Sequence, residues 1–115
     1  MRLCTQTALN GYAIMWLYVM FDLPVETTHQ RRVAARFRND ILKDGFCMHQ
    51  FSVYIRHCAS NEAAAVHIRR IQNMVPDEGM VTVLKVTDKQ FGDTIRFVGR
   101  KRKPPSPTPV QLEFF

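Results

Sequence analysis

Apolar and polar residues alternate along this chain with two different periods. Residues 13–21 form one unbroken apolar run, which Asp22 ends and Leu23-Pro24 stops. Apolar side chains at both odd and even positions predict a strand covered on both faces, and therefore inside its sheet. Within residues 46–57, apolar side chains alternate with more polar ones, which predicts two short strands or one bent hairpin. Residues 80–86 predict another strand.

Two segments between these strands have a helical period. The first is capped by Thr27 or Thr28 and ends before Gly45, and the second runs from a cap at Ser60 to Pro76. The order β-α-β-β-α-β predicts an α+β, ferredoxin-like fold, an antiparallel sheet with both helices on one face. The buried helix faces are predicted from apolar residues three or four apart: Val33, Phe37 and Ile41, then Ala64, Ile68, Ile71 and Val75.

The ends of the chain differ from this domain, which we expect to span residues 13–99. Residues 1–12 have no clear period and are expected to be an N-terminal extension. Residues 100–109 are basic and rich in proline, which is typical of a stiff linker. Residues 110–115 alternate again, with Val110, Leu112 and Phe114 on one side. We expect this strand to complete the sheet of a second copy in a homodimer. A frayed terminus is the alternative, but it would expose two phenylalanines.

Composition fits one small globular domain. The chain has 115 residues, of which 46% are hydrophobic and 23% charged. No apolar run approaches the length of about 20 residues that a membrane helix needs, so we expect no membrane span. Three cysteines, Cys4, Cys47 and Cys58, occur without a Cys-x-x-Cys pair, which argues against a disulfide framework. Such usage favours a reducing, cytoplasmic environment.

Positive charge is concentrated in two places. The formal net charge is +6, and the run Arg100-Lys101-Arg102-Lys103 alone carries four positive charges. Such clustering indicates a polyanionic partner, although a basic linker that only aids solubility is the alternative. The second group flanks the core stripe of the first helix and could neutralise phosphates without reading sequence. It consists of Arg31, Arg32, Arg36 and Arg38.

Asp22 is the candidate chemical group. A carboxylate at the end of an apolar strand is costly unless something compensates it. A single aspartate there commonly caps the next helix or pairs with an arginine, whereas the basic surroundings favour a metal ligand. Mg²⁺ sites usually combine one or two carboxylates with water and substrate phosphate. One Asp22 is too few for a two-metal site, but two Asp22 residues across a dimer axis could share one ion. Glu26 is the only other acid nearby.

Several segments together resemble a known family. They are YVMFDLP at 18–24, the arginine-bearing helix that follows, DGFCMHQFSVYIR at 44–56 and VTDKQF at 86–91. This combination resembles the small CRISPR adaptation protein, the dimeric partner of the CRISPR integrase, and most of all its type II branch. The resemblance covers residues 14–115, and residues 1–12 depart from it because typical members begin close to the first strand.

The resemblance implies a ferredoxin-like homodimer whose C-terminal strands are exchanged. Such a dimer bridges two integrase dimers and lies along duplex DNA before spacer insertion. Members have also been regarded as Mg²⁺-dependent endonucleases of RNA or DNA, with the aspartate at the end of the first strand as catalytic metal ligand. That position is Asp22 here.

Two other functions fit a small basic domain of this fold. Ferredoxin-like domains bind single-stranded RNA through aromatic side chains on their sheets, but the Lys/Arg-Gly-Phe-Gly-Phe type of run is absent here. A stand-alone, toxin-type ribonuclease would also depend on Asp22, without an integrase partner. Co-purification with an integrase would separate these functions from CRISPR adaptation.

Overall fold

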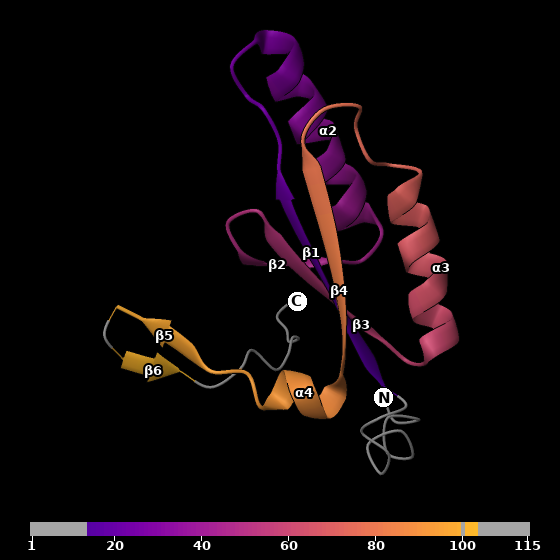
Figure 1. Ribbon diagram of the computed structural model, residues 1–115, viewed down its shortest axis with the longest axis vertical. Helices are drawn as coiled ribbons and strands as arrows, with labels where there is room; N and C mark the ends of the chain where they lie inside the picture. Colours follow the sequence, from indigo (N-terminus) through magenta and orange to yellow (C-terminus); the bar gives the residue numbers. More distant parts are fainter. Residues whose placement is uncertain (1–13, 100, 104–115) are drawn as a thin grey trace.

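A computed structural model describes residues 14–99 and 101–103 of the chain, and Figure 1 shows its elements. A four-stranded antiparallel sheet in the order β2-β3-β1-β4 forms the domain. This is the strand order of the ferredoxin-like fold, as predicted. Its elements are β1 (Met15–Asp22), α2 (Thr28–Lys43), β2 (Cys47–Gln50), β3 (Val53–Cys58), α3 (Asn61–Gln72) and β4 (Met80–Thr87).

The core lies between the sheet and the two long helices. Strand β1 pairs with β3 on one side and β4 on the other, which confirms that it is central. Its side chains at Leu17 and Val19 are fully buried against Phe37 and Ile41 of α2 and against α3. Because both helices contribute to one cluster, they cover the same face of the sheet. We call this the helix face and the opposite side the outer face.

The two helices begin where their caps predict. The Thr27 side chain accepts a hydrogen bond from the Gln30 backbone N–H, and the Gln30 side chain accepts one from the Thr27 backbone N–H. This capping box satisfies two N–H groups that the first turn leaves without partners. At α3 the Ser60 side chain accepts a hydrogen bond from the Ala63 N–H, without the reciprocal side-chain bond of a capping box.

Helix α3 ends earlier than its sequence pattern predicts. Ala64 and Ile71 are buried and Ile68 packs against the core, as expected. The helix stops at Gln72, however, and Val75 lies beyond it with 43% of its surface exposed. Pro76 disfavours helical backbone at the residue before it, so the helix unwinds upstream of the proline itself.

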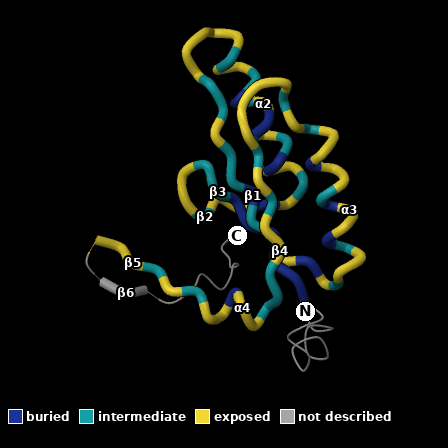
Figure 2. The backbone as a smooth tube through the Cα atoms, viewed as in Figure 1, coloured by how far each residue is buried: buried dark blue, intermediate teal, exposed yellow. Residues whose placement is uncertain are grey.

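A short helix covers one end of the outer face. Helix α4 (Asp88–Gly92) follows β4 directly and was not expected from the sequence. Phe91 of α4 stacks on Trp16 of β1, with ring centroids 3.9 Å apart, and Asp88 accepts a hydrogen bond of 2.7 Å from the indole nitrogen. No described segment covers the other end of the outer face, and Figure 2 shows β4 as mainly exposed and half-buried. Met80 and Leu84 are 68% and 47% exposed there.

A second, two-stranded sheet follows α4. Strand β5 (Arg96–Val98) pairs with β6 (Lys101–Lys103), and the turn between them contains Gly99 at a φ of +65°. Residues 101–103, expected in an extended linker, therefore form a strand. The expected extension at 1–12, Arg100, the proline-rich part of the linker and the exchanged strand at 110–115 lie outside the described residues.

Candidate functional site

Asp22 lies exposed at the last position of β1, on the outer face. Its backbone pairs with Met80 of β4. The helix that follows is capped by Thr27 rather than Asp22, and no described residue donates a hydrogen bond or an ion pair to the Asp22 carboxylate. Neither commonplace role for a strand-end aspartate therefore applies within the described part of the protomer. The carboxylate is available to a ligand.

The backbone around Asp22 is held by a close approach. Gly79 adopts a φ of +94°, and a Cβ added there would lie 2.7 Å from the Asp22 carbonyl oxygen and 2.7 Å from Leu23 Cδ2. Only glycine combines that φ with such close contact. Gly79 thus lets the turn before β4 pack directly against the end of β1 and fixes the position of Asp22.

An open hollow of about 330 Å³ lies beside the carboxylate. Asp22, Ser52 and Thr82 contribute its polar lining, while Met20 and Met80 are among its apolar residues. The turn between β2 and β3 closes one side, because the Ser52 carbonyl accepts a hydrogen bond of 3.1 Å from the Phe21 N–H. Three strands therefore meet at this hollow.

One protomer supplies only part of a metal site. Among residues 14–99 and 101–103, no group of three or more His, Cys, Asp or Glu side chains could hold an ion. Glu26 does not line the hollow. A single exposed carboxylate beside oxygen-bearing Ser52 and Thr82 fits a Mg²⁺ ion that takes its other ligands from water, phosphate or a second protomer. This geometry is compatible with the predicted Mg²⁺ ion shared by two Asp22 side chains. It does not provide a complete metal site within the described part of one protomer.

The four arginines of α2 do not form one surface. Arg32 and Arg36 are one turn apart and exposed on the same side of the helix. Arg31 and Arg38, two turns apart, lie on another side, and Arg38 is half-buried. The Arg31 guanidinium donates to the carbonyls of residues 25 and 26 and to the Thr28 hydroxyl, at 3.1–3.2 Å. Arg31 therefore orders the loop that follows Asp22.

The second predicted cationic group is placed only in part. Lys101, Arg102 and Lys103 pair through their backbones with Val98, Phe97 and Arg96 in the β5–β6 sheet. Arg100 lies outside the described residues. Residues 101–103 are therefore held in a strand by backbone pairing. Their contact with nucleic acid stays a prediction.

Comparison with known proteins identifies the family. The family model described as CRISPR associated protein Cas2 matches residues 15–94. A protein of Flavobacterium psychrophilum is 49% identical over 109 residues, which cover 95% of this chain and 95% of that protein. A protein of Parvibaculum lavamentivorans is 52% identical over 101 residues, which cover 88% of this chain and all of that protein. The chain belongs to the Cas2 family. Both relatives are named CRISPR-associated endoribonuclease Cas2.

The match confirms the family that the segments at 18–24, 44–56 and 86–91 indicated, because all three lie within it. As a Cas2 protein, the chain is a CRISPR component. No helix among the described residues has the length and apolarity to cross a membrane.

The outer face of this Cas2 domain also carries a pair of side chains, Tyr18 and His49, that the sequence did not predict to be in contact. Tyr18 points to the outer face like Asp22. Its ring contacts His49 of β2 edge to face, with ring centroids 5.7 Å apart. Burial raises the pKa of Tyr18, although a hydrogen bond with Thr94 and the positive charge of Arg96 act in the opposite direction. Burial and the charge of Arg96 both lower the pKa of His49. Both pKa shifts favour the uncharged form of these side chains, which pack against each other on the outer face.

A buried polar cluster joins the two helices to β3. The Asp44 carboxylate, 6% exposed, contacts His67 Nδ1 at 2.7 Å and accepts a hydrogen bond of 2.8 Å from Arg70. Arg56 donates to His67 Nε2 at 3.1 Å. Burial alone would raise the pKa of Asp44, but the hydrogen bonds from His67 and Arg70 outweigh it and lower the pKa. The sequence showed His67 only beside the buried face of α3.

Proposed function

We propose that this chain is a homodimeric subunit of CRISPR spacer acquisition that holds duplex DNA and bridges integrase dimers in the cytoplasm. Membership in the Cas2 family and the open outer face support this proposal. The observation that carries it is the position of Asp22 at the edge of an apolar sheet face that residues 14–99 and 101–103 of one protomer leave uncovered.

The open outer face supports a dimer. Met80 and Leu84 of β4 expose apolar side chains toward the same side as Asp22, and Phe97 in the following hairpin is 66% exposed. Large apolar side chains exposed on one face of a sheet favour an interaction site there. A second copy that packs on this face would cover it and bring the two Asp22 carboxylates toward one axis. Exchange of residues 110–115 would then extend the sheets.

Sequence-independent contacts with phosphates would hold the DNA. Arg32 and Arg36 present an exposed pair on α2, and the run at 100–103 adds a second cationic segment. Two-fold symmetry doubles both, so the dimer would contact roughly 6–10 phosphates and bind with a steep salt dependence. The neutralised phosphates position the duplex without specifying its sequence.

An acquisition assay tests this function. In cells with a repeat array and an integrase, deletion of the gene for this chain should abolish new spacers, and the wild-type gene should restore them. Replacing both Arg32 and Arg36 by Ala should reduce acquisition and duplex binding together. Acquisition that continues without this chain would refute the proposal and favour a stand-alone ribonuclease or an RNA-binding module.

Metal-dependent cleavage of phosphodiester bonds at Asp22 is a second candidate activity. The names of the Cas2 relatives and the Asp22 carboxylate, which has no partner among residues 14–99 and 101–103, favour it. Two Asp22 side chains would hold one Mg²⁺, which when bound activates water and offsets charge on the phosphate. The dimer would position the ion.

Labelled RNA and DNA, each with Mg²⁺ or with a chelator, test this activity. Cleavage should require Mg²⁺ and be lost in Asp22→Asn, while Asp93→Asn, which changes an exposed carboxylate on another segment, should cleave like the wild type. Cleavage that persists in Asp22→Asn would exclude this site. If Asp22→Asn loses cleavage but retains spacer acquisition, the adaptation role does not depend on hydrolysis.

A further inference from the structure

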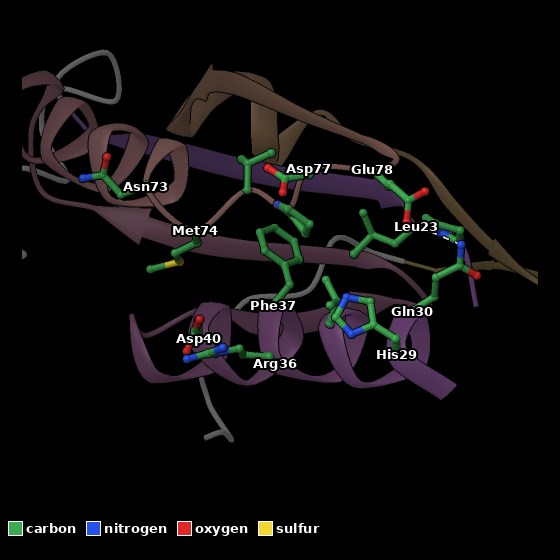
Figure 3. Close-up of a pocket in the computed structure, with 14 residues that line it drawn as sticks. Leu23, His29, Gln30, Arg36, Phe37, Asp40, Asn73, Met74, Asp77 and Glu78 are labelled. Carbon is green, nitrogen blue, oxygen red and sulfur yellow. Dashed lines mark hydrogen bonds between the residues drawn. The ribbon is translucent and has the colours of Figure 1, made fainter. Parts of the chain in front are cut away.

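A second concave surface lies on the helix face, on the opposite side of the sheet from the Asp22 side chain. It is a cavity of about 660 Å³ between α2, which lines it from His29 to Asp40, and the segment that follows α3 (Figure 3). We call it the interhelical groove. Its apolar lining comes from three parts of the chain: Leu23 before α2, Val33 and Phe37 on α2, and Met74, Val75 and Pro76 after α3.

The groove contains both a buried floor and an accessible lip. Phe37 is 1% exposed and belongs to the core, so it forms a rigid floor. Val75 is 43% exposed because α3 has already ended at Gln72. An apolar side chain of a partner could therefore contact Val75 without any rearrangement of the core. Apolar anchors in such preformed pockets contribute much of the binding energy at interfaces.

The rim of the interhelical groove is acidic, although the chain as a whole is basic. Asp40, Asp77 and Glu78 line it, against the cation Arg36. None of these three carboxylates forms an ion pair with another described residue. Gln30 donates a weak hydrogen bond of 3.4 Å to Glu78 and thereby links α2 to the far rim. In a chain with a net charge of +6, this local excess of negative charge attracts lysine or arginine.

We propose that the interhelical groove docks a segment of the integrase that presents an apolar side chain next to a lysine or arginine. This inference rests on the proposed function, in which the integrase is the protein partner. Asp77 and Glu78 attract a basic protein segment on the side of the groove opposite α2, while Arg36 on α2 is one of the two residues proposed to contact DNA (Figure 3). The groove also lies on the opposite side of the sheet from the outer face, so each protomer of a dimer could bind integrase while its outer face contacts the second copy.

Charge reversal at the rim is the first test. Binding of purified integrase to the full-length protein is measured by titration calorimetry without DNA. Asp77→Lys with Glu78→Lys should weaken binding about tenfold or more, because two attractions become repulsions. The control, Glu62→Lys with Asp93→Lys, changes the net charge equally at exposed acids outside the groove and should stay within about twofold. Both rim residues are exposed, so the fold should tolerate the change.

Loss of apolar contact is the second test. Val75→Asn should weaken integrase binding about fivefold, because it removes an apolar contact at the lip. Val66→Asn is the matched control, since Val66 is 38% exposed on α3 and does not line the groove. Dimer mass and thermal unfolding should be the same in the two variants, so that a difference in binding reports on the groove.

The outcomes separate this inference from the proposed function. If wild type binds integrase and both groove variants bind equally well, the integrase docks elsewhere and the inference is wrong, while the proposed function stands. If wild type does not bind integrase, both fail.

Discussion

Replacing Asp44 by Ala tests the buried polar cluster that joins α2, α3 and β3. Asp44→Ala removes the acceptor for two contacts, from His67 at 2.7 Å and from Arg70 at 2.8 Å, at a site where the carboxylate is only 6% exposed. Hydrogen bonds to charged groups each contribute about 1.5–3 kcal/mol when one partner is removed. The Arg70 side chain is 57% exposed, so water can replace most of the hydrogen bonding that Arg70 loses with the Asp44 carboxylate.

The buried His67 contact therefore dominates, and we expect the free energy of unfolding to fall by about 2–3 kcal/mol. Urea denaturation followed by circular dichroism measures this change, at one fixed protein concentration because association adds to stability. The matched control is Asp40→Ala, one turn earlier on α2, whose carboxylate forms no ion pair among the described residues. It should change stability by less than about 0.5 kcal/mol.

The pH dependence gives an independent check. The pKa of Asp44 is lowered in the folded protein from its usual value of 3.8, so the folded state binds this proton less readily than the unfolded state. The stabilisation is therefore complete above the unfolded pKa and is lost as pH falls through the folded one. The difference between wild type and Asp44→Ala should be constant near neutral pH and shrink in acid. Equal stability of Asp44→Ala and Asp40→Ala at pH 7 would refute the reasoning.

Three further perturbations have defined outcomes. Gly79→Ala should destabilise the protein by about 1–3 kcal/mol in the same denaturation assay. Gly79 has a φ of +94°, and the added Cβ would lie 2.7 Å from the Asp22 carbonyl oxygen. Gly92→Ala is the control and should not destabilise the protein, because nothing lies within 4 Å of the added Cβ. Equal effects at both glycines would contradict the close approach at the end of β1. Phe91→Ala should shift the emission of the single tryptophan, Trp16, to the red and raise its quenching by acrylamide, because it removes the ring stacked on the indole. Unchanged emission would show that α4 does not cover Trp16. Removing residues 110–115 should weaken the dimer, and an unchanged dimer mass in light scattering across dilution would exclude strand exchange.

The main elements were predictable because their signals are local. The apolar run at 13–21 showed a two-sided strand, and β1 is central in the sheet. The caps at Thr27 and Ser60 placed both helix starts to within a residue. The end of α3 was misjudged because the apolar spacing continues to Val75 after the backbone has left the helix.

Helix α4 and the β5–β6 pair could not be predicted from the same patterns. Five residues are too few to show a helical period, and the only local signal for α4 is the capping box between Thr87 and Gln90. Its stability depends on Trp16, which is distant in sequence. The basic strand β6 has no hydrophobic alternation, and its pairing depends on a turn at Gly99.

The candidate site was predictable in part for a similar reason. The end of an apolar run located Asp22 correctly, but only the fold shows that the local acid Glu26 is not beside it in the hollow. Helical spacing alone could have shown that Arg31 and Arg32, as neighbours in sequence, point to different sides of α2. The Asp44–His67 contact joins residues 23 positions apart, and no sequence period relates them.

The central position of β1 has a consequence for how the chain folds during synthesis. Met15 pairs with Cys58 on one side and with Thr87 on the other, so the first strand made receives its neighbours late. Until β4 leaves the ribosome, the apolar residues of β1 have an unpaired edge. Folding that depends on such distant pairings is slow and exposes intermediates to aggregation. The nascent domain is therefore most vulnerable after β3 is made and before β4 arrives, and chain truncation within α3 would leave it in that state.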